Sequence, residues 1–152
     1  SPNMSLMEIR AKCRRLKQRN NLRLVIIDYL QLMSSGKRVE SRQQEVSEFS
    51  RALKLLAKEL EVPVIALSQL NRGPEQRTDK KPQMSDLRES GSIEQDADMV
   101  ILLHRESLYE RESPREGEAD LIVAKHRNGP TDTIVVAFQG HYSRFTNMAS
   151  SF

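Results

Sequence analysis

In this 152-residue chain, a short apolar run stops abruptly at one carboxylate: Leu24-Val25-Ile26-Ile27-Asp28-Tyr29. Consecutive branched aliphatic residues without polar alternation are typical of a strand that is buried on both faces of a parallel sheet. The strand ends at a carboxylate, Asp28. Ligands of doubly wound sheets bind beyond the carboxyl ends of the strands, so Asp28 is expected at a ligand site. The alternative is that Asp28 only caps a turn, because aspartate is common at strand ends.

Helical patterns flank this strand on both sides. A capping box, Ser5-Leu6-Met7-Glu8, and apolar residues at helical spacing predict an amphipathic helix that ends near Asn20. A polar loop is predicted over residues 34–40. From Ser41 a second helix of about 20 residues is predicted. Its apolar face is made of Val46, Phe49, Leu53, Leu56 and Leu60.

A second buried strand follows the long helix. Pro63 ends the helix, and Val64-Ile65-Ala66-Leu67 has the composition of a buried strand. The order of strand, helix and strand implies a right-handed parallel crossover. Asp28 and Gln69, which follow the two strands, are therefore expected at the same edge of the sheet.

The next part of the chain is predicted to alternate loops with one strand. Residues 71–83 have no apolar side chain apart from prolines and are predicted to form a mobile loop. An ordered segment over residues 84–92 leads to a third apolar strand, Met99 to Leu103. A charged loop then covers about residues 105–117.

The chain is predicted to end in antiparallel strands. Apolar segments over residues 120–127 and 133–138 are joined by Asn128-Gly129-Pro130. Asn-Gly is a hairpin signal, and Pro130 makes the turn longer than the minimal two-residue type. A last short strand is expected around Tyr142 to Phe145.

The composition is that of a soluble globular protein, with 38% hydrophobic and 30% charged residues. No apolar run approaches the ~20 residues of a membrane span, and no signal peptide is recognised. Cys13 is the only cysteine, which excludes an internal disulfide and fits a reducing cytoplasm. The formal net charge is +3, and basic residues gather in the first helix. They form either a solvated helix face, which we favour, or a surface for phosphates or a subunit interface.

A carboxylate after a buried strand is the arrangement of the Walker B aspartate in P-loop nucleotidases. However, no G-x-x-x-x-G-K-[ST] motif occurs, so the sequence offers no ring of backbone N–H groups for the β- and γ-phosphates. Tyr29, rather than a glutamate, follows Asp28. The chain is therefore either no ATPase or the second half of one, and its opening on what resembles a middle helix favours the second possibility.

Five runs keep the form and the order of one family. They are Glu8–Leu16, Leu24–Met33, Ile65–Arg72, Ser85–Asp98 and Ala124–Pro130. Together they resemble the bacterial replicative helicases of the DnaB family, and the resemblance covers nearly the whole chain.

The resemblance implies an α/β fold, namely an incomplete RecA-like P-loop NTPase fold in which parallel strands and helices are followed by antiparallel strands. Residues 1–152 would be the C-terminal part of one RecA-like ATPase domain. The family's phosphate loop and catalytic glutamate would lie upstream, and Ser1 would fall in the middle of the domain. The implied protein hydrolyses ATP with Mg²⁺ and translocates on single-stranded DNA to unwind duplexes. It would be a homo-hexamer in the bacterial cytoplasm, at the nucleoid or replisome, with a primase and a helicase loader as partners and no membrane partner.

The resemblance also implies roles for the two residues at the strand ends. Asp28 would help to hold Mg²⁺, mostly through water, and Gln69 would sense the γ-phosphate. The alternative for Gln69 is a side chain that only satisfies a loop.

Family DNA contacts map onto Arg88, Glu89 and Gly91. Arg88 can bind a phosphate oxygen, and Gly91 allows close approach of the backbone. Glu89 cannot attract a phosphate, so it would orient Arg88 or accept from a backbone donor. The alternative is a polar turn before a helix.

Lys125 and Arg127 lie two residues apart on a predicted strand and are expected on the same face, together with Leu121 and Val123. The resemblance implies that this pair acts in trans on the nucleotide of a neighbouring protomer. The alternative is a solvated hairpin tip.

Two other functions are compatible with the sequence. One is an ATP-independent module that binds single-stranded DNA or a replisome partner. The other is a RecA-like recombination ATPase, which fits the run Leu87–Ser92 less well. The isolated chain is expected to be inactive, with an incompletely covered core.

Overall fold

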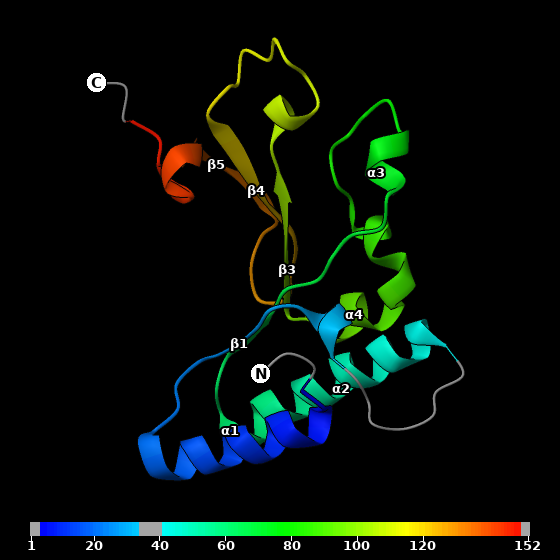
Figure 1. The fold of residues 1–152 in the computed structure, drawn as a ribbon, viewed down its shortest axis with the longest axis vertical. Helices are drawn as coiled ribbons and strands as arrows, with labels where there is room; N and C mark the ends of the chain where they lie inside the picture. Colours follow the sequence, from blue (N-terminus) through cyan, green and yellow to red (C-terminus); the bar gives the residue numbers. More distant parts are fainter. Residues whose placement is uncertain (1–3, 34–40, 150–152) are drawn as a thin grey trace. The chain divides into compact units, whose positions relative to one another are not determined.

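The computed structural model of the chain describes residues 4–33 and 41–149, with the backbone alone described for residues 88–91. The chain divides into two compact units (Figure 1). Unit 1 consists of Ser1–Leu70 and Leu87–Ala97, and unit 2 consists of Asn71–Asp86 and Asp98–Phe152. The loop predicted over residues 34–40 lies outside the described residues.

Helix α1 (Leu6–Asn20) begins at the predicted capping box. Ser5 Oγ accepts a hydrogen bond from Glu8 N at 3.3 Å, and the Glu8 carboxylate accepts one from Ser5 N at 2.7 Å. Both halves of the box are therefore formed, and this prediction is confirmed. The helix ends at Asn21, whose φ of 51° is left-handed. The exposed basic residues of α1 are Arg10, Lys12, Arg14, Arg15 and Arg19.

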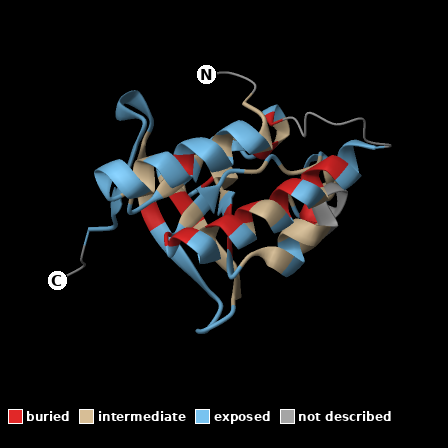
Figure 2. Ribbon diagram, turned by 90° about the horizontal axis from the view of Figure 1, so that it is seen from below, coloured by how far each residue is buried: buried red, intermediate tan, exposed pale blue. Residues whose placement is uncertain are grey.

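Helix α2 (Arg42–Leu60) is the long helix predicted after Ser41, whose Oγ accepts a hydrogen bond from Gln44 N at 3.2 Å. It ends at Glu61, which is left-handed with a φ of 52° and donates its N–H to carbonyls of the last turn. All the positions predicted for its apolar face are buried, and they form a stripe along the helix (Figure 2). They are Val46, Phe49, Leu53, Leu56 and Leu60.

Strands β1 (Val25–Ile27) and β2 (Val64–Ala66) pair in parallel and in register, as predicted. The prediction that they are buried on both faces is wrong. Val25 packs against side chains of α1 and α2, whereas Ile26 is 61% exposed and Ile65 is 52% exposed. The reason is that the helices of unit 1 cover one face of this two-stranded sheet and leave the alternate side chains exposed.

The core of unit 1 lies between this covered face and the helices. One cluster joins Cys13, Leu56, Leu60 and Val62, and the other joins Leu30, Met33, Phe49 and Leu53. Leu30 belongs to the short 3₁₀ helix η1 (Leu30–Leu32) that follows Asp28. Helix α4 (Gly91–Asp96) is attached to α2 by Ser50, whose Oγ donates to Asp96 Oδ2 at 2.7 Å.

Unit 2 is built on an antiparallel sheet with the order β3-β4-β5-β6. Its strands are β3 (Met99–His104), β4 (Glu118–His126), β5 (Asp132–Gln139) and β6 (Arg144–Asn147). The predicted apolar strand and the predicted hairpin are confirmed. The last strand begins later than predicted, because Tyr142 belongs to the 3₁₀ helix η4 (Gly140–Tyr142) and Ser143 turns the chain with a φ of 47°.

The loops predicted over residues 71–83 and 105–117 contain helical turns that the sequence pattern did not predict. The loop predicted over residues 71–83 contains a short helix, α3 (Gly73–Gln76), with Pro74 in its first turn. The 3₁₀ helices η2 (Met84–Ser90) and η3 (Glu106–Leu108) lie in the following ordered segment and in the charged loop. The hydrophobic pattern missed α3 because polar contacts and a proline, rather than apolar periodicity, hold it. Among the described helices, none combines the length and the apolar content needed to cross a membrane.

Candidate functional site

Asp28 lies immediately beyond the carboxyl end of β1, where its side chain is exposed. Backbone pairing with the next strand continues around it: Leu67 N donates to Ile27 O at 2.9 Å, and Leu30 N donates to Leu67 O at 2.9 Å. The Asp28–Tyr29 peptide bond is cis. These contacts fix the backbone on both sides of Asp28 and leave its carboxylate to solvent.

Gln69 follows β2 at the same edge of the parallel sheet. Its backbone is held by the side chain of Gln31 in η1. Gln31 Oε1 accepts a hydrogen bond from Gln69 N at 3.2 Å, while Gln31 Nε2 donates to Gln69 O at 3.3 Å and to Ser68 Oγ at 3.1 Å. Within residues 4–33 and 41–149 the carboxamide of Gln69 itself has no hydrogen-bond partner, so it can meet a ligand.

Arg42 in the first turn of α2 holds Gln31 in turn. Its guanidinium donates to the carbonyl oxygen of Gln31 and, at 3.0 Å, to that of Met33. The same guanidinium is paired with the buried carboxylate of Glu45. Sequence reasoning missed these residues. A signal existed for Glu45, which lies four residues before Phe49 and therefore on the apolar face of the helix.

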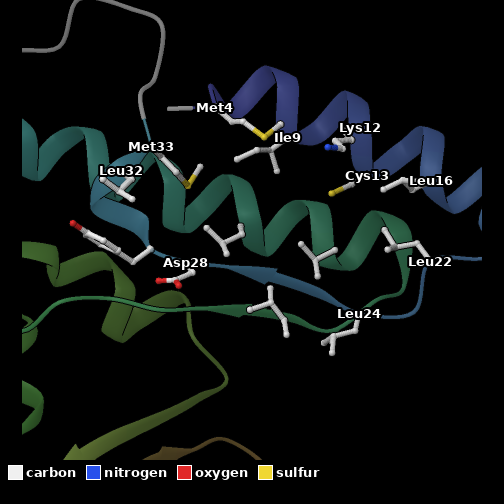
Figure 3. Close-up of a pocket in the computed structure, with 14 residues that line it drawn as sticks. Met4, Ile9, Lys12, Cys13, Leu16, Leu22, Leu24, Asp28, Leu32 and Met33 are labelled. Carbon is white, nitrogen blue, oxygen red and sulfur yellow. The ribbon is translucent and has the colours of Figure 1, made fainter. Parts of the chain in front are cut away.

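A cavity of about 380 Å³ lies between α1 and β1, with Asp28 among its lining residues (Figure 3). Most of the other lining residues are apolar, among them Ile9, Leu16 and Met33. Cys13 also lines it, and burial raises the pKa of the Cys13 thiol. This lining does not suit a triphosphate, so phosphate contacts have to come from elsewhere.

Asp28 can still take part in binding a metal ion. In the part of the chain that the structure describes, no group of three or more His, Cys, Asp or Glu side chains is placed to hold a metal. One exposed carboxylate nevertheless fits Mg²⁺, which prefers oxygen ligands and keeps several of its waters when it also binds phosphates.

Lys125 and Arg127 belong to unit 2, and their predicted placement is partly wrong. Lys125 pairs with Val100, whereas Val123 pairs with Ile101, so β4 has one extra residue at Ala124. Such a bulge reverses the alternation of side chains. Directly opposed residues share a face of the sheet, so Lys125 shares the face of the buried Val100, and Val123 shares the opposite face with Ile101, which is 51% exposed.

Arg127 lies one residue beyond β4 and contacts Asp98 twice. Its guanidinium Nη1 is 2.8 Å from Asp98 Oδ1, and its backbone N donates to Asp98 O at 2.8 Å. Both side chains are about half exposed. Sequence reasoning did not identify Asp98 as a partner, because the residue precedes β3 and nothing in the pattern links it to the hairpin turn.

Arg88 and Glu89 lie in η2, and Gly91 begins α4. The side chains of Arg88 and Glu89 fall outside the described part of the structure, as does the burial of Gly91. The preceding Asp86 is buried at 3% exposure and accepts hydrogen bonds from Arg77 at 2.7 and 3.0 Å and from Gln83 N at 2.7 Å. Asp86 therefore anchors the start of the segment for which DNA contacts are expected.

Comparisons with known proteins agree over almost the whole chain. Residues 1–147 match the family described as the DnaB-like helicase C terminal domain. The replicative DNA helicase DnaB of Leifsonia xyli subsp. xyli (strain CTCB07) is 83% identical over 149 residues, which cover 98% of this chain and 33% of that protein. The replicative DNA helicase DnaB of Geobacillus stearothermophilus is 56% identical over 153 residues, which cover 100% of this chain and 34% of that protein. The chain thus spans about a third of the length of these curated relatives.

Solved structures give the same result. A structure of a DnaB-like replicative helicase and its interactions with primase has a TM-score of 0.92 and 47% identity, covering 97% of this chain and 36% of that one. An ATPase domain also has a TM-score of 0.92 and 47% identity, and the match covers 52% of its length. The α/β fold of this chain is therefore that of part of such an ATPase domain.

Proposed function

The chain belongs to the DnaB-like helicase C-terminal domain family, and we propose that residues 1–152 are the C-terminal part of one RecA-like ATPase domain. The proposal is supported by the solved ATPase domain, of which the match covers only 52%. It is also supported by the sequence, which has no phosphate-loop motif to accompany Asp28. The phosphate loop and the catalytic glutamate would belong to the half that precedes these residues.

The full-length protein would be a hexameric replicative helicase that couples ATP hydrolysis at subunit interfaces to translocation on single-stranded DNA. The observation that carries this proposal is the parallel pair β1 and β2, which brings the exposed residues Asp28 and Gln69 to one edge of the sheet. Ligands bind at this edge in α/β proteins.

Asp28 would hold Mg²⁺, mostly through its bound waters, and the metal would neutralise charge on the phosphates of ATP. Gln69 would sense the γ-phosphate through its carboxamide. Both residues have a fixed backbone and an exposed functional group, as a site that binds and releases nucleotide requires.

Lys125 and Arg127 would act on nucleotide bound to a neighbouring protomer. A planar guanidinium and an ammonium suit an oxyanion on which charge develops during phosphoryl transfer. Because Arg127 is paired with Asp98 in unit 2, we propose that it leaves this carboxylate when it engages a phosphate.

Arg88, Glu89 and Gly91 would form the contact region for single-stranded DNA. Arg88 would bind a phosphate oxygen, Gly91 would allow close approach of the backbone, and Glu89 would orient Arg88 or accept from a backbone donor. Such contacts carry little base preference. The proposed partners are other copies of the same protein, single-stranded DNA, a primase and a helicase loader at a bacterial replisome. The primase is suggested by the solved relative described with its primase interactions.

The test is Asp28→Asn in the full-length protein, with Glu48→Gln as a control that removes one exposed carboxylate from α2. Loss of a metal-binding charge costs several kcal/mol of transition-state stabilisation, so steady-state ATP turnover should fall by about 100-fold or more. The control should keep wild-type turnover. Equal turnover in wild type and Asp28→Asn would contradict the assignment, and single-stranded DNA binding by a wild type that lacks ATPase activity would favour an ATP-independent binding module.

A further inference from the structure

The side chain of Gln31 binds both backbone groups of Gln69. We propose that Gln31 is a positioning residue, which fixes the backbone of Gln69 so that its carboxamide is held ready for the γ-phosphate. The inference rests on the proposed role of Gln69 and adds to it the group on which that role depends.

The contact replaces a missing strand neighbour. Regular pairing ends where Leu67 N donates to Ile27 O and Leu30 N donates to Leu67 O, because the chain after Asp28 turns into η1. A carboxamide carries the same donor and acceptor as a peptide group. Gln31 therefore offers Gln69 an N–H donor and a carbonyl acceptor, at 3.3 and 3.2 Å, much as a neighbouring strand would.

Gln31 is itself firmly held. Its neighbour Leu30 is 2% exposed and packs in the core of unit 1 with Phe49. Its carbonyl oxygen accepts a hydrogen bond from Arg42, which also donates to Met33 O at 3.0 Å and is paired with a buried carboxylate of the same helix turn. The two hydrogen bonds from the Gln31 side chain to the Gln69 backbone are called the clamp below. The clamp is thus anchored to α2, whose apolar face forms the core.

An anchored backbone matters for a sensor that acts through a flexible side chain. Gln69 lies in a loop and is exposed, so without the clamp its carboxamide could occupy many positions. A misplacement of about 1 Å can cost on the order of 100-fold in rate. Loss of the clamp should therefore lower kcat for DNA-stimulated hydrolysis while KM for ATP, set mainly by the phosphate-loop half, changes little.

The variants to compare in the full-length protein are Gln31→Ala and Gln31→Glu. The alanine removes every contact. The glutamate keeps an acceptor for Gln69 N and places a second acceptor against Gln69 O, which is repulsive. Gln18→Glu is the matched control, because it makes the same change on the exposed face of α1.

The first measurement is hydrogen exchange of the peptide that contains residue 69, which reports on the clamp without any reference to activity. Both Gln31 variants should speed exchange of the Gln69 amide, and Gln18→Glu should leave it unchanged. Exchange is measured on the assembled hexamer. A variant that has lost its fold is recognised in the same experiment, because the core peptides of α2 would then exchange faster as well. Wild-type exchange at residue 69 in Gln31→Ala would overturn the clamp.

The second measurement is a double-mutant cycle on DNA-stimulated ATP turnover with Gln31→Ala, Gln69→Ala and the double variant. We expect each single variant to lower kcat by about 10-fold or more, and the double variant to be no worse than Gln69→Ala alone, because both changes act through one group. Additive losses, or a normal Gln31→Ala beside an impaired Gln69→Ala, would overturn the positioning role and leave the proposed function standing. A normal Gln69→Ala would overturn both the sensor and its positioning.

Discussion

At the scale of single residues, an ion pair between Arg115 and Asp120 stabilises unit 2, and its contribution should depend on pH. The carboxylate of Asp120 is 5% exposed and accepts two hydrogen bonds from the Arg115 guanidinium, at 2.5 and 3.0 Å. Arg115 also donates to Glu118 at 2.8 Å, so one guanidinium holds the start of β4. The hydrogen bonds from Arg115 lower the pKa of Asp120 below its ordinary value.

A lowered pKa in the folded state adds stability that is present above the unfolded pKa of about 3.9 and is lost as the pH falls through the folded value. Asp120→Asn should therefore lower the free energy of unfolding by about 2 kcal/mol at pH 7. The difference from wild type should shrink below about pH 4. Urea unfolding of the full-length protein at several pH values measures this, with the exposed Asp132→Asn as the control. A difference that does not change with pH would contradict the role of Asp120.

Arg127 gives the second prediction at this scale. An arginine supplied in trans to the transferred phosphate, known as an arginine finger, contributes about 10³-fold or more in rate. For this reason Arg127→Ala should abolish ATP hydrolysis in a homogeneous hexamer while ATP binding persists. Mixing it with subunits that carry Asp28→Asn should restore some activity, since some interfaces then combine an intact Asp28 with an intact neighbouring Arg127. Arg111→Ala, which removes an exposed arginine of a loop, is the control.

The measurement is steady-state ATP turnover of purified mixtures after confirmed subunit exchange, and it tests whether Arg127 acts on the nucleotide of a neighbouring protomer. The assignment is contradicted if Arg127→Ala alone hydrolyses ATP normally and if mixing it with Asp28→Asn subunits leaves turnover unchanged. Arg127 would then be part of a solvated hairpin turn and not an arginine finger.

At the scale of elements, the connection between residues 71 and 86 is held by hydrogen bonds and an ion pair. Asn71 N donates to Asp86 O at 3.1 Å, and Arg77 donates to the Asp86 carboxylate and to Lys81 O. Lys80 Nζ donates to Glu75 O at 2.5 Å. A buried carboxylate therefore organises a segment that has almost no apolar side chains.

Arg77→Ala should release this connection, because Asp86 then loses its guanidinium partner. Trypsin should cleave the full-length protein faster after Lys80, whereas Lys81 is followed by Pro82 and should resist. Arg72→Ala removes an exposed arginine of the same segment and should cleave at the wild-type rate. Equal cleavage of the two variants would show that the ion pair does not hold the segment.

The elements also show what the sequence could predict. Capping residues and apolar periodicity predicted α1 and α2 correctly, because both signals are local. The bulge at Ala124 could not be predicted, since its cause is the register between β3 and β4. Gln31 and Asp98 were missed for the same reason: each partner lies far away in the sequence. The position of Asp28 and Gln69 at one edge of the sheet could be predicted because strand ends are visible in a hydrophobic pattern.

At the scale of the whole molecule, the described part of the chain exposes more apolar surface than a closed core would. In unit 1 the exposed residues include Leu24, Ile26, Ile65 and Leu67, and in unit 2 they include Met99, Ile101 and Leu103. Side chains of this kind on strand faces are normally covered by further elements.

The isolated 152-residue chain should therefore self-associate or unfold easily, and it should not hydrolyse ATP. Sedimentation at several concentrations and thermal unfolding test the first point, and turnover against a buffer control tests the second. A monomer with a sharp unfolding transition at every concentration would contradict the expectation of an incomplete core. Turnover that Asp28→Asn abolishes would show that the chain carries a complete site.

The pair between Arg127 and Asp98 has a consequence for timing. An exposed ion pair contributes about 0–1 kcal/mol, which corresponds to an equilibrium constant between about 1 and 5. The Arg127 guanidinium is then dissociated from the Asp98 carboxylate for a substantial fraction of the time. Exposed side chains change rotamer within nanoseconds. Asp98 would hold the Arg127 side chain between its contacts with phosphate. Because dissociation of this ion pair is fast, slower steps would limit the rate of the proposed helicase cycle.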